Sequence, residues 1–211
     1  MIFDHPIYPI TNTRLSGLSH ADQARVFAEQ GVALIQIREK SLTSRAFYKA
    51  ASAAVEAIKG TRSKLIVNDR VDIAMAVGAD GVHLGQEDLR PGYARDLLGA
   101  NVLIGYSTHT IDQVREALEM PVDYIAFGPI FGTSTKEDPD PPTGIEALKK
   151  VKELAGPVPV VAIGGINKEN IAEVKESGVN AAALIGALYA GENEIQNNVS
   201  ELTSKWSDKN V

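Results

Sequence analysis

In the segment QIREK and the isoleucine before it, Gln36 and Arg38 alternate with Ile35 and Ile37, and Lys40 follows two residues later. Because successive strand residues point to opposite faces, Gln36, Arg38 and Lys40 should share one face. A forked guanidinium beside an ammonium is suited to bind a diphosphate. The alternative is an internal ion pair with Glu39 or another nearby acid, which would leave the cations a purely structural role.

Carboxylates follow the next two apolar runs, KLIVN and GVHL. Magnesium prefers one or two carboxylates together with phosphate oxygens, so Asp69 and Asp88 are expected to share one Mg²⁺ that bridges to a diphosphate. The alternative for Asn68 or Asp69 is to cap the helix expected around VDIAMAV. His83, inside the run GVHL, is by itself more often a hydrogen-bonded core residue than a catalyst.

Hydroxyl groups and a lysine follow the fifth and sixth apolar runs. Ser107 ends the fifth run, and the long loop after the sixth carries Thr133, Ser134, Thr135 and Lys136. Several hydroxyl donors and one ammonium are suited to hold phosphate oxygens as charge develops on a leaving group. A solvated Ser/Thr loop is the common alternative.

Glycines end the last two apolar runs, AIGGI and ALIGAL. Gly164, Gly165 and Gly186 would let a phosphate approach backbone N–H groups, and loops after strands seven and eight of parallel barrels commonly bind phosphate. Each glycine alone is equally explained by a tight turn from strand to helix. The pattern indicates two anion sites, and therefore two phosphorylated substrates.

Eight β-branched or apolar runs alternate with segments of helical spacing, which predicts parallel strands joined by crossover helices. Eight such units favour a single-domain (β/α)₈ TIM barrel over residues 1–211, and a doubly wound sheet is the alternative. The catalytic barrel is expected at about 7–190 and a C-terminal helix at about 192–206. Ser19, Thr110 and Asn167 are the expected helix N-caps.

The composition is that of an ordinary globular protein, with 44% hydrophobic and 23% charged residues among 211. A net charge of −6 argues against broad nucleic-acid binding. The absence of cysteine excludes disulfides, thiolate metal sites and a Cys nucleophile, and fits the cytoplasm. We expect no signal peptide and no membrane span, and small-molecule substrates as partners. The sequence leaves open whether the chain is a homo-oligomer.

Five blocks of the sequence resemble, in order, the signatures of the thiamine phosphate synthase family: QIREK, LIVNDRVDIAMAVGADGVHLGQEDL, IGYSTHT, DYIAFGPIFGTSTK and VPVVAIGGINKENIAEV. The similarity runs from about Tyr8 to Tyr189. It implies a barrel enzyme that joins hydroxymethylpyrimidine pyrophosphate to a thiazole phosphate with Mg²⁺ as cofactor, giving thiamine monophosphate and pyrophosphate.

The resemblance also implies roles for individual residues. The pyrophosphate would be held by Gln36, Arg38, Lys40, Asn68 and Lys136, with Mg²⁺ on Asp69 and Asp88. Ser107 would assist the departing pyrophosphate together with Lys136 and Arg38, and His83 would lie on the pyrimidine side. The thiazole phosphate would be bound by Thr133, Thr135, Gly165, Ile185 and Gly186.

Three positions depart from the family pattern. Gly186 stands where the family usually has serine, which removes one hydroxyl from the expected thiazole phosphate site. Gly132 stands where the family has proline, and Asn12 where it has an acid. Neither of the last two falls on the expected chemistry.

Two other functions fit parts of the sequence. The aminothiazole tautomerases resemble this chain and use a histidine after the fifth strand, where His109 lies. They tend to lack the Asn68-Asp69 pair and the HLGQxD segment, both of which are present. A catalytically inactive thiazole phosphate sensor would require a broken metal site, whereas Asp69 and Asp88 are both retained.

Overall fold

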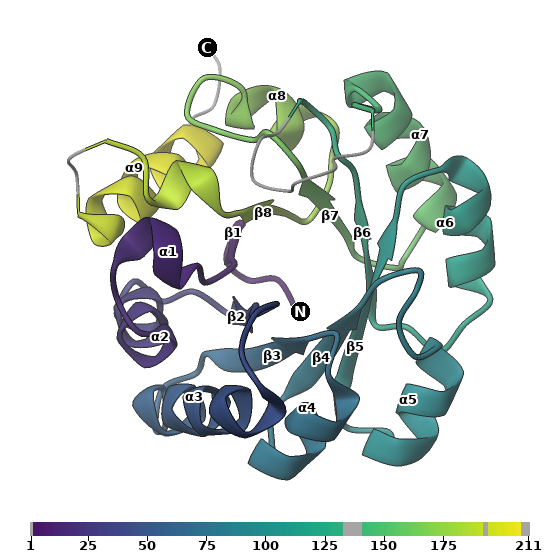
Figure 1. Cartoon of the computed structure of the whole chain (residues 1–211). Coiled ribbons are helices and arrows are strands. Elements are labelled where there is room, and N and C mark those ends of the chain that lie inside the picture. The colour runs from purple at the N-terminus through teal and green to yellow at the C-terminus, as the bar shows by residue number, and fades with distance from the viewer. Residues whose placement is uncertain (1, 133–140, 192–193, 208–211) are drawn as a thin grey trace.

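The chain forms a barrel of parallel strands surrounded by helices, as the view along the barrel axis shows (Figure 1). The computed structural model describes residues 2–132, 141–191 and 194–207. The (β/α)₈ prediction is confirmed, and the doubly wound alternative is wrong because the first and second strands also meet. A parallel bridge between Ile10 and Gln36 joins them, with the Thr11 N–H donating to the Gln36 carbonyl at 2.9 Å.

Every strand coincides with one of the eight predicted apolar runs. The strands are β1 (Ile7–Pro9), β2 (Leu34–Ile37), β3 (Lys64–Asn68), β4 (Gly81–Leu84), β5 (Leu103–Thr108), β6 (Tyr124–Phe127), β7 (Val160–Ile163) and β8 (Ala181–Leu184). Their order is β1-β8-β7-β6-β5-β4-β3-β2, with all paired neighbours parallel. The carboxyl ends of all eight strands therefore lie at one mouth of the barrel.

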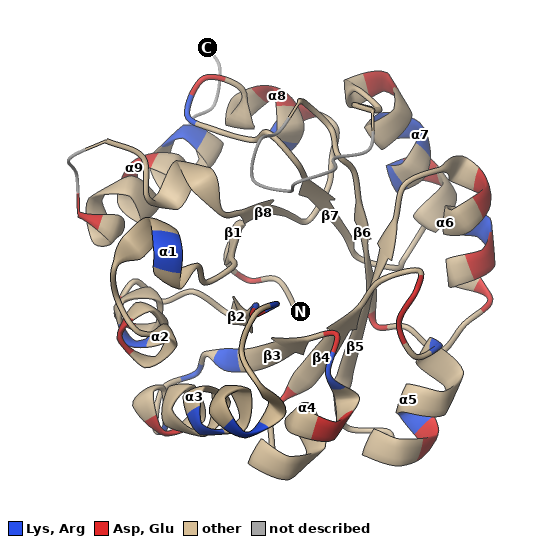
Figure 2. Cartoon of the chain, in the orientation of Figure 1, with Lys and Arg blue, Asp and Glu red and all other residues tan. Residues whose placement is uncertain are grey.

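Helices follow the strands and pack around the barrel. They are α1 (Thr13–Ser16), α2 (His20–Glu29), α3 (Ser44–Ala57), α4 (Val71–Val77), α5 (Pro91–Leu98), α6 (Ile111–Leu118), α7 (Ile145–Ala155), α8 (Ile171–Glu176), the 3₁₀ turn η1 (Gly186–Leu188) and α9 (Ile195–Ser207). Both charge signs are mixed on the helices that ring the barrel (Figure 2). Among the described residues, no helix combines the length and apolar character needed to cross a bilayer.

Two of the three predicted N-caps are confirmed. The Ser19 side chain accepts from the Asp22 N–H at the start of α2, and the Thr110 side chain accepts from the Gln113 N–H at the start of α6. The Asn167 prediction is wrong, because Asn170 is the N-cap of α8. The Asn167 side chain instead accepts from the Glu169 N–H at 2.9 Å, which forms a turn ahead of the helix.

The strands separate two apolar layers. A smaller cluster, including Leu34, Ile66 and Tyr124, fills the barrel interior, and a larger one, including Ile35 and Ile37, lies against the helices. Residues two apart along a strand thus share a face, as the alternation in QIREK predicts. Gln36 falls on the interior face with Leu34.

The N-terminal segment enters the barrel interior (Figure 1). Phe3 is 8% exposed and packs edge to face on Tyr8 and Tyr124, with ring centroids 5.9 and 5.3 Å apart. These three rings pack together in the interior of the barrel, below the polar groups at its mouth.

Candidate active site

The end of β2 directs two cations toward the mouth of the barrel. Arg38 is partly exposed, and its backbone N–H donates to Thr11 Oγ1 at 3.3 Å. Lys40 Nζ pairs with Asp69 Oδ2 at the end of β3. The predicted alternative of an ion pair to a nearby acid is therefore realised for Lys40, although its partner is the expected metal ligand and not Glu39.

Asp69 adopts a left-handed backbone conformation, with φ of 63°, the one described non-glycine residue with positive φ. Aspartate tolerates this region better than most residues, yet the conformation costs on the order of 1 kcal/mol. Its N–H donates to the His83 carbonyl at 2.8 Å, which ties the end of β3 to β4. The capping alternative is wrong for both Asn68 and Asp69, because Arg70 is the N-cap of α4 and makes no side-chain cap.

The carboxyl groups of Asp69 and Asp88 lie together at the mouth. Partial burial raises the pKa of Asp88, the Gly85 N–H opposes this by donating to Asp88 Oδ2 at 2.7 Å, and the charge and hydrogen bond of Asp69 raise it further. Two acids in contact repel each other when both are ionised. The two carboxylates could bind a cation, and the neighbouring Lys40 could bind an anion.

A hydrogen-bond chain crosses the barrel interior from β2 to β5. Gln36 Nε2 donates to Tyr8 Oη at 3.0 Å, and Tyr8 Oη lies 2.7 Å from Tyr124 Oη. Tyr124 Oη lies 3.0 Å from His83 Nδ1, and His83 Nε2 lies 2.9 Å from Ser107 Oγ. The chain joins five strands, β2, β1, β6, β4 and β5 in order, and ends at the serine predicted to assist the leaving group.

With Gln36 Nε2 as the donor to Tyr8, only one arrangement of the hydrogens along this chain gives each of them an acceptor. Tyr8 Oη accepts from Gln36, so its hydrogen goes to Tyr124, and the Tyr124 hydrogen goes to His83 Nδ1. The His83 ring then carries its hydrogen on Nε2 and donates it to Ser107 Oγ. The Ser107 hydroxyl accepts within the protein and has its own hydrogen left to donate toward the mouth.

Burial keeps His83 neutral, as this arrangement requires. The side chain is 5% exposed, and desolvation lowers its pKa to about 4, although the nearby Asp69 charge opposes the shift. The ring stacks on Tyr124 with centroids 5.5 Å apart. His83 is thus both a core residue, as the alternative predicted, and the direct partner of Ser107.

Gly105 and Gln86 complete the surroundings of Ser107. A Cβ on Gly105 would lie 2.1 Å from Tyr124 Cζ and 2.5 Å from His83 Nδ1, so only glycine admits this pair. Gln86 Nε2 donates to the Ser107 carbonyl at 2.6 Å, which fixes the strand end beneath the hydroxyl.

The glycines after β7 are required by the backbone itself. Gly164 and Gly165 have φ of 99° and 63°, and a Cβ on Gly165 would lie 2.4 Å from the Gly132 carbonyl oxygen. The tight-turn explanation is therefore confirmed for both, and binding of phosphate by Gly165 stays a prediction. Ile185 and Gly186 begin the 3₁₀ turn after β8, where Gly186 is exposed.

Some of the predicted site residues are assembled and others lie outside the described residues. Gln36, Arg38, Lys40, Asn68, Asp69, His83, Asp88 and Ser107 all lie on β2 to β5 or on the loops after these strands. Thr133, Thr135 and Lys136 are not among the described residues. The sequence interpretation missed Tyr8 and Tyr124. Each is a tyrosine in an apolar strand at a position whose side chain points into the barrel, and that position was the available signal.

Comparisons with known proteins identify the family of the chain. The family model described as thiamine monophosphate synthase matches residues 7–188. The thiamine-phosphate synthase of Syntrophomonas wolfei is 41% identical over 204 residues, with 96% of this chain and 97% of that protein covered. That of Vibrio parahaemolyticus is 42% identical over 189 residues, with 89% and 91% covered.

Solved structures with a similar fold include a member of the same family. Thiamine phosphate pyrophosphorylase from Pyrococcus furiosus superposes with a TM-score of 0.85 at 33% identity, covering 97% of this chain and 96% of that one. A 3-hexulose-6-phosphate synthase, with a TM-score of 0.69 at 19% identity over 95% and 99% of the chains, shares the fold alone. A model match over most of the chain and relatives at about 40% identity show that this transferase belongs to the thiamine monophosphate synthase family.

Proposed function

We propose that the chain condenses hydroxymethylpyrimidine pyrophosphate with hydroxyethylthiazole phosphate, giving thiamine monophosphate and pyrophosphate. The bond from the pyrimidine methylene carbon to the pyrophosphate oxygen breaks first and leaves a pyrimidine-stabilised cation, and the thiazole nitrogen then forms its bond to that carbon. Because this path is dissociative, no protein nucleophile is required. The observation that carries the proposal is the meeting of Lys40, Asp69 and Asp88 at the mouth of the barrel, where β5 with Ser107 also ends.

Arg38, Lys40 and Ser107 act on the leaving pyrophosphate in this proposal. The two cations offset its charge, and the Ser107 hydroxyl donates to an oxygen on which charge grows as the bond breaks. Donation is possible because Ser107 accepts from His83 and keeps its own hydrogen. Lys136, outside the described residues, is assigned the same task by the family resemblance.

A Mg²⁺ ion fits the residues at the mouth. Among the described residues no three His, Asp or Glu side chains cluster so as to hold a metal alone, but Mg²⁺ characteristically takes one or two carboxylates and completes its shell with phosphate oxygens and water. Asp69 and Asp88 are the carboxylates. Burial raises the pKa of Asp88 most, and the charge of Asp69 raises it further, a repulsion that a bound cation would relieve. When bound, the ion supplies neutralising charge to the pyrophosphate.

The thiazole phosphate is assigned to the side of the mouth formed by β7 and β8. Gly165 and the turn at Ile185 and Gly186 follow these strands, and their backbone N–H groups are assigned to the phosphate. Thr133 and Thr135 are assigned to the same phosphate by resemblance. Gly186 lacks the hydroxyl of the family serine, so backbone groups carry more of this contact. A cytoplasmic location is a further part of the proposal.

The test is release of inorganic pyrophosphate when the purified protein is mixed with both substrates and Mg²⁺. We expect release that depends on all three components, with formation of thiamine monophosphate. An aminothiazole tautomerase would isomerise its own substrate without releasing pyrophosphate. Absence of release with every component present, while a tautomerase assay gives turnover, would overturn the proposal.

A further inference from the structure

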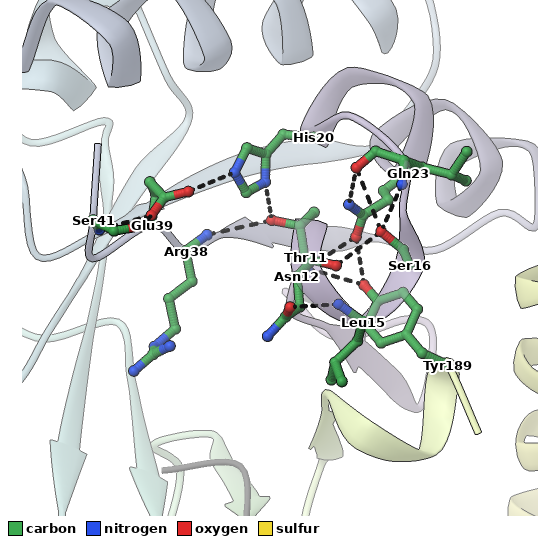
Figure 3. A network of polar contacts seen from close by, with 11 residues as sticks. Thr11, Asn12, Leu15, Ser16, His20, Gln23, Arg38, Glu39, Ser41 and Tyr189 are labelled. Carbon is green, nitrogen blue, oxygen red and sulfur yellow. Dashed lines mark hydrogen bonds and ion pairs between the residues drawn. The ribbon is translucent and has the colours of Figure 1, made fainter. Parts of the chain in front are cut away.

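The loop that follows β2 contacts a polar cluster of Thr11, His20 and Glu39 (Figure 3). Thr11 Oγ1 lies 2.7 Å from His20 Nδ1, and His20 Nε2 lies 3.5 Å from Glu39 Oε2. His20 is 4% exposed and Thr11 is 2% exposed. The cluster therefore joins the end of β1, the start of α2 and the loop that carries Arg38 and Lys40.

The hydrogens of the cluster run in one direction. The Arg38 N–H donates to Thr11 Oγ1, whose hydroxyl donates to His20 Nδ1. A neutral His20 then has its hydrogen on Nε2, which faces the Glu39 carboxylate. The other carboxylate oxygen accepts from the Ser41 N–H and from Ser41 Oγ, both at 2.8 Å.

Glu39 lies between two cations in the sequence but turns away from both. Its side chain points to His20 and Ser41, whereas the Arg38 side chain extends away from the cluster (Figure 3). A carboxylate that swung to the mouth would pair with Arg38 or Lys40 and repel a diphosphate. Contacts that hold Glu39 back therefore keep a further carboxylate away from Arg38 and Lys40.

We infer that Thr11, His20 and Glu39 are positioning residues that set the loop after β2, so that Arg38 and Lys40 face a diphosphate while the intervening carboxylate is kept out. The inference rests on the proposed function, because it concerns how the same site recognises its anion. It assigns no contact with substrate to the three residues, which act through Arg38 and Lys40.

The test variants are Thr11→Val and Glu39→Ala. The controls are Thr11→Ser, which keeps the hydroxyl, and Glu56→Gln, at an exposed residue of α3 that pairs with Lys59. Steady-state assays give kcat and KM for each substrate, and calorimetry gives the affinity for inorganic pyrophosphate with Mg²⁺. We expect Thr11→Val and Glu39→Ala to raise KM for the pyrimidine pyrophosphate and to weaken pyrophosphate binding on the order of tenfold, because small misplacements of binding groups are costly. KM for the thiazole phosphate should not change.

A double-mutant cycle separates positioning from a general loss of stability. In an Arg38→Ala background, Glu39→Ala should add little to the KM, because the group that it positions is already gone. Thr11→Ser and Glu56→Gln should behave as the unaltered protein. Equal changes in both KM values, or a lower melting temperature with unchanged KM, would overturn the inference. Failure of the unaltered protein to release pyrophosphate would instead contradict the proposed function.

Discussion

His83 Nε2 donates to Ser107 Oγ across 2.9 Å, and this contact determines what the serine can do. The donor direction is set from the far side of the barrel, by Gln36 through Tyr8 and Tyr124. A serine that receives a hydrogen bond from a neutral histidine is not activated as a nucleophile, since no base removes its proton. Its hydroxyl hydrogen is left to donate outside the chain, which is the role that we propose for it on the leaving group.

Replacing Ser107 by alanine is expected to slow the chemical step about 10² to 10³-fold, because one donor to a developing oxyanion is lost. Lys136→Ala should act in the same way. Binding of the pyrimidine pyrophosphate should weaken less than the rate falls. Single-turnover kinetics measure both, with Ser200→Ala on α9 as the control; unchanged single-turnover rates would refute the assigned roles.

The buried His83 should make stability depend on pH. Its pKa is about 4 when folded and near 6.5 when unfolded, so between these values the unfolded chain binds the additional proton. The free energy of unfolding should therefore fall as pH drops from about 6.5 to about 4, by about 3 kcal/mol in total from this residue. Urea unfolding at several pH values gives the free energy of unfolding as a function of pH, and this free energy should change less with pH in His83→Gln. An identical pH dependence in the two proteins would contradict burial of a neutral histidine.

Replacing Asp88 by asparagine should have opposite effects with and without the metal. Removal of one of two repelling carboxylates should leave the melting temperature of the metal-free protein unchanged or higher, since asparagine can still accept from the Gly85 N–H. The rise in melting temperature on adding Mg²⁺ with inorganic pyrophosphate should disappear. Asp72→Asn, at an exposed pair with Arg70, serves as the control and should keep that rise; a rise retained in Asp88→Asn would remove Asp88 from the metal site.

Restoring the family serine should improve binding of the thiazole phosphate. In Gly186→Ser, one added hydrogen bond of about 0.5 to 1.5 kcal/mol would lower the KM for that substrate roughly two- to tenfold. The value of kcat should change little, because the bond is present in both the ground state and the transition state. Ala190→Ser, close by on an exposed position, is the control, and an unchanged KM in Gly186→Ser would show that Gly186 does not face the phosphate.

Much of the site was accessible from the sequence because parallel strands end at one mouth. Runs such as KLIVN and GVHL located the strands, and the period of two placed Gln36 and Arg38 on the inward side. The residues after the strands, Asp69 and Asp88, then had to converge. These inferences needed only local periodicity and the topology of the barrel.

Tertiary structure alone decided which side chains meet. The pairing of Tyr8 with Tyr124, which are 116 residues apart, depends on strand register and on the space left at Gly105. The turn of Glu39 toward His20, and of Lys40 toward Asp69, depends on backbone conformations after the strands, such as the positive φ of Asp69. Periodicity determines the face of a side chain, but its partner is determined by the stagger of strands and by loops whose dihedral angles no repeat encodes.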